Sequence, residues 1–167
     1  DVLVNNVGDY RPSTGYFVGS DPETWQALYE INLHHVFTTT HAFAGGMAER
    51  GSGSIVNVST VEAMRGAPGN SVYSAFNAGV IAFTKGLARE MARFDINVNC
   101  VCPGPTDTPL MAAVPDKLKE AFAHATPMRR LAKPSEIADA ILFFASARAD
   151  FVTGQVLSVS GGLTMAG

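Results

Sequence analysis

Short apolar runs alternate with longer stretches of helical periodicity along the chain. Four of these runs are rich in valine and isoleucine and end at glycine, proline or a small polar residue. Such runs predict β-strands, because β-branched residues fit a pleated, buried surface and turn residues interrupt the pairing. The four runs are "DVLVNNVG" (1–8), "SIVNVST" (54–60), "INVNCVCPG" (96–104) and "GQVLSVSGG" (154–162).

Apolar residues at intervals of three and four positions predict helices between these strands. The predicted helices cover residues 22–49, 71–93, 116–124 and 134–146. The first has a clear start signal, since Ser20 and Glu23 are spaced as a capping box and Pro22 suits a first turn. Gly51 marks its end.

The order strand, helix, strand, helix, strand, helix, strand predicts an α/β fold, in which a parallel sheet is covered by helices on both faces. The chain has 167 residues and shows no internal repeat or low-complexity linker. We therefore expect residues 1–167 to form one domain or part of one.

Composition and charge exclude several classes of protein. Hydrophobic residues make up 47% of the chain and charged residues 16%, which is typical of a globular protein. The net charge is −3 and no lysine or arginine cluster occurs, so we expect no nucleic-acid partner. No apolar run is long enough for a membrane span and no signal peptide is evident, which favours a cytoplasmic protein. Cys100 and Cys102 are the only cysteines, and we expect both to be reduced and buried.

Five motifs in register resemble those of the classical short-chain dehydrogenase/reductase family. They are "NNVG" (5–8), "EINLHHVF" (30–37), "NVST" (57–60) followed by "YSAFN" (73–77), "CPGPTDTP" (102–109) and "FVTGQVLSVSGG" (151–162). The resemblance extends over essentially the whole chain. It implies a Rossmann-like fold with a three-layer, doubly wound parallel sheet.

The resemblance also implies a function. Members of this family transfer a hydride between NAD or NADP and a secondary alcohol or ketone. Tyr73 would be the acid–base group, Thr60 would orient the carbonyl oxygen, Asn32 would support a water chain, and Asn77 would occupy the position of the family's catalytic lysine. No metal site is implied.

The same family pattern implies how cofactor and substrate would be held. Residues 105–133 would form a lid over a small-molecule alcohol or ketone. The residues implied in cofactor binding are Asn6, Val7, Gly8, Tyr73, Asn77, Pro103, Gly104, Thr106 and Thr108. NAD and NADP are both compatible with these residues.

Asn77 departs from the family pattern in a way that affects the chemistry. A free phenol has a pKa of about 10, and a lysine ammonium about 5 Å away would lower it by roughly 2 units at an effective dielectric constant of about 20. Asn77 supplies no charge, although it could still bind a ribose hydroxyl. Lys85 lies about 18 Å from Tyr73 along the predicted helix, so it is no substitute. Arg65, in the loop after Thr60, stays open as an alternative cation.

A second departure concerns the cofactor. The family's glycine-rich turn, G-x-x-x-G-x-G, does not occur in this sequence, and the first motif matches the family's fourth strand. The chain is therefore expected to lack the N-terminal βαβ units and to bind a dinucleotide poorly by itself. Two functions remain open. One is an NAD(P)-dependent oxidoreductase, and the other is a non-catalytic, truncated relative that retains half of the fold and the oligomer interface.

The resemblance finally implies association. Family members assemble through two long helices that match residues 22–49 and 71–93. The run "DVLVNN" would form an exposed sheet edge in this chain, and apolar edges favour association. A homodimer or homotetramer is expected.

Overall fold

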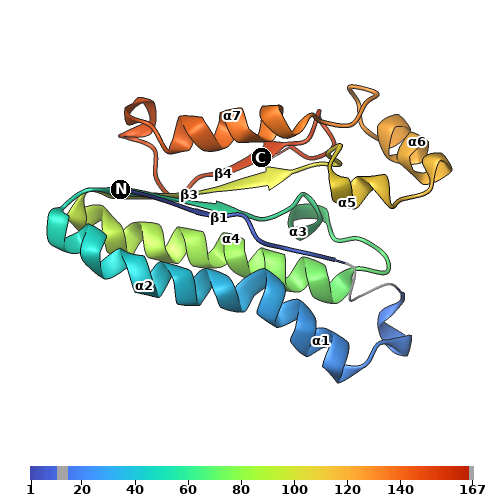
Figure 1. Cartoon of the computed structure of the whole chain (residues 1–167), viewed down its shortest axis with the longest axis horizontal. Coiled ribbons are helices and arrows are strands. Elements are labelled where there is room, and N and C mark those ends of the chain that lie inside the picture. The colour runs from blue at the N-terminus through green and yellow to red at the C-terminus, as the bar shows by residue number, and fades with distance from the viewer. Residues whose placement is uncertain (11–14, 166–167) are drawn as a thin grey trace.

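The computed structural model describes residues 1–10 and 15–165 and contains a four-stranded sheet (Figure 1). The strands run in the order β1-β2-β3-β4, and every neighbouring pair is parallel. Their bounds are Val2–Asn5 (β1), Gly53–Val58 (β2), Ile96–Pro103 (β3) and Val156–Val159 (β4). The four strands predicted from the sequence are confirmed, as is the parallel α/β architecture.

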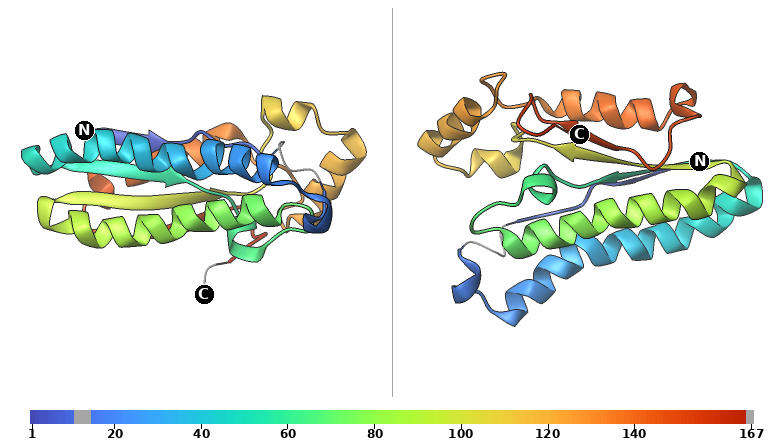
Figure 2. Two further views of the ribbon diagram at one scale, coloured as in Figure 1. Left: turned by 90° about the horizontal axis from the view of Figure 1, so that it is seen from below. Right: turned by 180° about the vertical axis from the view of Figure 1, so that it is seen from behind.

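Helices cover both faces of the sheet, so the molecule has three layers (Figures 1 and 2). The α-helices are α1 (Pro22–Tyr29), α2 (His35–Arg50), α3 (Glu62–Arg65), α4 (Ser71–Met91), α5 (Pro109–Ala112), α6 (Asp116–Ala125) and α7 (Pro134–Phe144). Short 3₁₀ turns occupy Phe17–Gly19, Ala92–Phe94 and Ala147–Ala149.

The two faces have separate apolar cores. Ile55 and Val98 face α2 and α4, where they pack with Met47 and Met91. On the opposite face of the sheet, a second cluster joins β2 and β3 to α7 and the turn that follows it. Its buried members are Val56, Val101, Ile137, Phe144 and Ala149. Neighbouring residues of β2 therefore enter different cores, which explains why this strand is apolar on both sides.

The predicted helix over 22–49 is not continuous. A π-helical turn at Glu30–His34 separates α1 from α2. The predicted cap is also wrong, because the N-cap is Asp21, whose side chain accepts the backbone N–H of Thr24. The Ser20 hydroxyl instead bonds to the Phe17 carbonyl and accepts the indole N–H of Trp25. Two adjacent residues with capping side chains made the sequence ambiguous at this point.

Strand β1 forms one edge of the described sheet, as predicted. Val2 and Val4 point to the face that carries α7 and remain 49% and 40% exposed. On the other face, the buried Asn5 side chain donates to the Asn57 side-chain oxygen at 2.8 Å, and Asn57 donates to the Thr84 hydroxyl at 2.9 Å. These bonds tie β1, β2 and α4 together inside the core.

Two further expectations concern the core and the surface. Cys100 and Cys102 are both free and buried in β3, as predicted. Hydrogen bonding to the Cys102 thiol and burial both raise the pKa of Cys100. In the part of the chain that the structure describes, none of the helices is long and apolar enough to cross a membrane.

Candidate active site

A cavity of about 470 Å³ lies at the carboxyl ends of β2 and β3. Ligands of open α/β sheets bind in this position, because loops from neighbouring parallel strands meet there. The walls come from the loop after β2, from α3 and the start of α4, from the loop after β3, and from α5 and α6. Tyr73, Thr60, Pro103, Gly104, Thr106 and Thr108 all line it.

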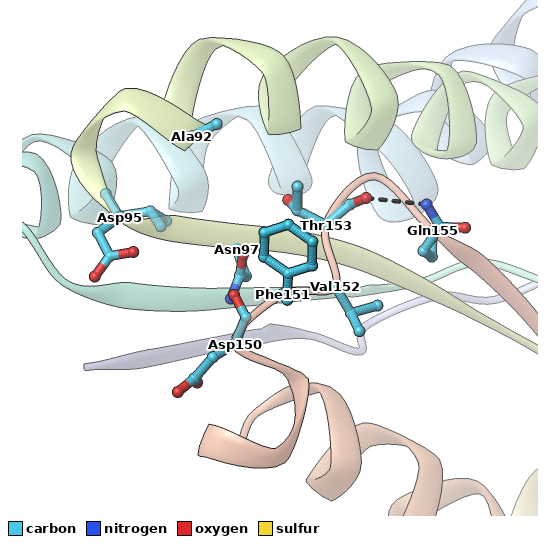
Figure 3. Close-up of a pocket in the computed structure, with 9 residues that line it drawn as sticks. Ala92, Asp95, Asn97, Asp150, Phe151, Val152, Thr153 and Gln155 are labelled. Carbon is cyan, nitrogen blue, oxygen red and sulfur yellow. Dashed lines mark hydrogen bonds between the residues drawn. The ribbon is translucent and has the colours of Figure 1, made fainter.

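A second hollow of about 500 Å³ lies at the opposite end of β3 (Figure 3). Asp95, Asp150 and Phe151 are among its lining residues. The Gln155 side chain, also in the lining, donates a hydrogen bond to the Thr153 carbonyl at 3.0 Å. None of the site residues predicted from the sequence lines this hollow. The cavity around Tyr73 is therefore the candidate site.

Tyr73 lies in the first turn of α4 and its phenol is largely buried. Burial raises the pKa of Tyr73 to about 12, and the carboxylates of Glu62 and Asp9 add to this shift. Hydrogen bonding with the Thr60 hydroxyl partly opposes it. The Tyr10 ring meets the Tyr73 ring edge-on, with the centroids 6.4 Å apart. The phenol is therefore protonated at neutral pH, beside the hydroxyl that the sequence predicted as its partner.

Asn77 lies one turn further along α4, where its side chain turns back to its own helix. The amide donates to the Tyr73 carbonyl at 3.0 Å, and the residue is 4% exposed. The backbone carbonyl of Asn77 accepts the Ser59 hydroxyl at 2.9 Å. Asn77 does not line the cavity, and among the described residues no lysine or arginine lowers the pKa of Tyr73.

Asn32 is buried within the π-helical turn and fixes the loop that follows β1. Its side-chain oxygen accepts the backbone N–H of Asp9 at 3.1 Å, and its amide donates to the Asp9 and Leu28 carbonyls, each at 2.9 Å. The Asn32 side chain thus holds the backbone of the loop after β1 against its own helix. Turns of π-helix are frequent at functional sites.

The loop after β3 is held tightly against β4. Gly104 donates its N–H to the Val159 carbonyl, and a Cβ atom at Gly104 would lie 2.8 Å from the Cα of Ser160. No larger residue fits here without moving the backbone. Thr106 bonds to the Gly104 carbonyl, and the Thr108 hydroxyl caps α5.

The remaining predicted residues lie partly outside the cavity. Asn6, Val7 and Gly8 follow β1 on the surface and do not line it, and a Cβ atom at Gly8 would come within 3.1 Å of the Asn32 side-chain oxygen. In the predicted lid, Leu110 and Met111 line the cavity.

Sequence reasoning missed Tyr10 and left Arg65 open as a cation near Tyr73, and both residues line the cavity together with Glu62. Glu62 and Arg65 begin and end α3, and their charged groups are 3.6 Å apart. A helix of four residues shows no periodicity, so only the short spacing from Thr60 pointed to these side chains.

Comparison with known protein families identifies a match over residues 1–164, to the family described as enoyl-(acyl carrier protein) reductase. The acetoacetyl-CoA reductase of an Acinetobacter strain is 43% identical over 165 residues, which are 99% of this chain and 66% of that protein. The 3-oxoacyl-[acyl-carrier-protein] reductase of Thermotoga maritima is 42% identical over 165 residues, with the same coverage.

Solved structures of dehydrogenases and reductases are also similar to this chain. A 3-oxoacyl-[acyl-carrier protein] reductase from Brucella melitensis with bound NAD superposes with a TM-score of 0.91 at 35% identity, over 99% of this chain and 63% of that one. A putative 2-deoxy-D-gluconate 3-dehydrogenase from Agrobacterium tumefaciens with bound NADP gives a TM-score of 0.92 at 35% identity, over 98% and 67%. The chain spans 65–66% of the length of the first curated relatives.

Proposed function

The chain belongs to the classical short-chain dehydrogenase/reductase family, and from this premise we propose that the cavity around Tyr73 is a site of NAD(P)-dependent hydride transfer between a secondary alcohol and a ketone. One observation carries the proposal. The Tyr73 phenol and the Thr60 hydroxyl meet in a cavity at the carboxyl ends of β2 and β3. By name, the relatives of this chain include an acetoacetyl-CoA reductase and a putative 2-deoxy-D-gluconate 3-dehydrogenase, which supports the reaction class.

The two hydroxyl groups have complementary roles in this proposal. The protonated Tyr73 phenol donates a hydrogen bond to the substrate carbonyl oxygen and passes its proton there as the alcohol forms. Thr60 donates a second hydrogen bond that fixes the same oxygen. Asn32 holds the loop after β1 against the π-helical turn and so fixes the position of that loop beside the site. Bound NAD(P) would supply the hydride, or accept it in the reverse direction.

The described residues fit the nicotinamide half of such a cofactor. The close packing of Gly104 on Ser160 holds the loop after β3 against the end of β4, and Thr106 and Thr108 line the cavity. We assign Pro103, Gly104, Thr106 and Thr108 to this half, with Asn6, Val7 and Gly8 along its path beyond the cavity. Asn77 is assigned to the ribose in the family pattern, but its amide is already bonded to the Tyr73 carbonyl.

The 167-residue chain by itself should bind NADH and NADPH only weakly. The family's glycine-rich turn, which would hold the pyrophosphate at a helix N-terminus, does not occur in its sequence. Calorimetric titration of the purified chain should give dissociation constants no tighter than about 1 mM. A low-micromolar constant for either dinucleotide would show that other residues hold the pyrophosphate.

The reaction itself is tested in a form of the protein that binds NAD(P). Oxidation of a secondary alcohol, followed by absorbance of the reduced nicotinamide, should fall by a factor of about 100 or more in Tyr73→Phe. Thr60→Val should cost less, about tenfold, since it removes one positioning hydrogen bond. Full activity in Tyr73→Phe would contradict the proposed role of Tyr73 as the acid–base group.

A non-catalytic relative remains the second candidate, and one observation favours it. The Asn77 amide turns away from a phenol whose pKa is about 12. Without a cation at this position the site keeps its cavity, but nothing there stabilises the phenolate form of Tyr73. In that case the chain would keep a ligand cavity and an assembly surface.

We also propose that residues 105–133 form the lid of the cavity. Leu110, Met111, Leu118 and Phe122 present apolar side chains to it. Met128 falls in the same segment, but it is 66% exposed and does not line the cavity, so the lid surface ends before it.

The chain should form a homodimer or homotetramer through the outer faces of α2 and α4. Phe43 on α2 is 57% exposed, and Phe37 packs against Phe83 of α4 at the surface between the two helices. Such apolar surface favours association. Sedimentation at micromolar concentration should give a dimer or larger species that Phe43→Glu weakens. Val18→Glu, at a residue 98% exposed in the turn before α1, is the matched control. A monomeric wild type would contradict the proposal.

A further inference from the structure

Arg65 places a positive charge in the wall of a cavity whose lining is otherwise mostly apolar. Glu62 and Arg65 are the only charged side chains among the described residues that line it. Leu110, Met111 and Phe122, from α5 and α6, add apolar side chains to the same cavity. A ligand that fills this space would therefore meet both hydrocarbon side chains and a guanidinium group.

The guanidinium group of Arg65 is available to a ligand. Its nearest charged partner is Glu62, at 3.6 Å, which is longer than a hydrogen bond. Within residues 1–10 and 15–165, no hydrogen bond from the Arg65 side chain is formed, although a guanidinium carries five N–H donors. Its side chain is 43% exposed and that of Glu62 is 22% exposed, and an ion pair at this distance contributes little to stability. Arg65 can thus turn toward a ligand at little cost.

The start of α4 reinforces the positive charge. Asn70 and Tyr73, at the N-terminal end of this 21-residue helix, both line the cavity. Helix α3, which contains Arg65, packs against α4. The first turn of α4 contains no acidic residue. The positive end of its dipole therefore faces the same space as Arg65.

We propose that Arg65 binds the carboxylate of the substrate, so that the site takes a hydroxy or keto carboxylic acid with an apolar tail. The inference rests on the proposed function, because it takes the cavity around Tyr73 to be the substrate site. Arg65 forms charge-assisted, bidentate bonds to the carboxylate, while the carbonyl oxygen lies against Tyr73 and Thr60 and the tail against the lid. A single cation beside Glu62 suits a monoanion, because a phosphate dianion would be repelled more strongly by that carboxylate.

The proposal is tested by binding, which needs neither cofactor nor turnover. The probes are 3-hydroxyoctanoate and its methyl ester, which share the hydroxyl group and the tail and differ in charge. Calorimetry on the wild-type chain should show the acid bound about tenfold more tightly than the ester. Arg65→Met should remove that preference, and Arg65→Lys should retain part of it, because lysine keeps the charge without the bidentate geometry.

Arg50→Met is the matched control. Arg50 ends α2 and is not part of the cavity lining, its side chain is 52% exposed, and its ion pair with Asp1 is 3.9 Å long. This variant should bind both probes as the wild type does. Thermal unfolding should be the same in all four proteins, since neither arginine is buried.

Two outcomes overturn the proposal. The first is a wild-type chain that binds the acid no more tightly than the ester, or not at all up to about 10 mM. The second is an unchanged preference in Arg65→Met. Failure of the proposed function alone gives a different result. The preference for the acid would still depend on Arg65, but a form of the protein that binds NAD(P) would show no turnover that depends on Tyr73.

Discussion

Replacement of Asn77 by lysine should raise the rate of alcohol oxidation at neutral pH about tenfold or more, in a form of the protein that binds NAD(P). The pKa of Tyr73 is about 12, so that only about one phenol in 10⁵ is ionised at pH 7. A lysine at position 77 lies one helical turn from Tyr73 on the same face of α4. A lowering of the pKa of Tyr73 by a single unit already increases the phenolate tenfold, which corresponds to about 1.4 kcal/mol.

The direction of the pH dependence follows from the same shift. Oxidation needs the phenolate, so the rate of the wild type should rise throughout the range from about pH 6 to pH 10 without reaching a plateau. The Asn77→Lys variant should reach its plateau at a lower pH, because its Tyr73 ionises more easily. Initial rates at saturating alcohol, measured across this range, test both statements.

Two variants keep this test specific. Asn77→Gln extends the side chain without adding charge and should leave the rate within about twofold of the wild type. The double variant Asn77→Lys with Tyr73→Phe should lose the gain entirely. If Asn77→Lys gives no gain in protein shown to bind cofactor, Tyr73 is activated by another group or is not the acid–base residue.

Replacement of Asn57 by leucine should destabilise the folded chain by about 3 kcal/mol. Asn57 is fully buried in β2 and exchanges hydrogen bonds with Asn5 and Thr84 across two different elements. Leucine removes both bonds and leaves the Asn5 amide and the Thr84 hydroxyl with fewer partners in the core. A buried polar group without its partner costs about 1–3 kcal/mol.

Urea-induced unfolding at a fixed protein concentration measures this loss, because association also contributes to the apparent stability. The midpoint should fall while the slope stays the same. Asn6→Leu is the matched control, since Asn6 follows β1 as an exposed residue, and it should change the stability by less than about 0.5 kcal/mol. Equal midpoints for Asn57→Leu and the wild type would show that the network contributes nothing to stability.

The sequence by itself determined the strands, the long helices and their order. The run that became β2 is apolar on both sides because the strand is covered by helices on both faces, and Ile55 and Val56 enter opposite cores. The spacing along 71–93 likewise gave α4 nearly to the residue. Such patterns are readable because burial of a whole face repeats at the period of the element. Short or interrupted elements, such as α3 and the π-helical turn, lack that repeat.

The sequence also determined which segments meet at the candidate site. Thr60 follows β2 and Pro103 ends β3, and parallel neighbouring strands bring their carboxyl ends to one edge of the sheet. Tyr73, in the first turn of α4, reaches the same edge. The gathering of these residues in one cavity was therefore predictable from topology alone.

Only the tertiary structure decided how these groups act on one another. The elevated pKa of Tyr73 arises from burial and from carboxylates on two other segments, and the Asn77 amide is oriented by a bond within its own helix. The position of Arg65 in the cavity wall depends on how α3 packs against α4. Charge, burial and side-chain direction are set by neighbours distant in sequence, whereas periodicity is set by the chain itself. For this reason the sequence identified several residues that line the candidate cavity, and their environment came from the fold.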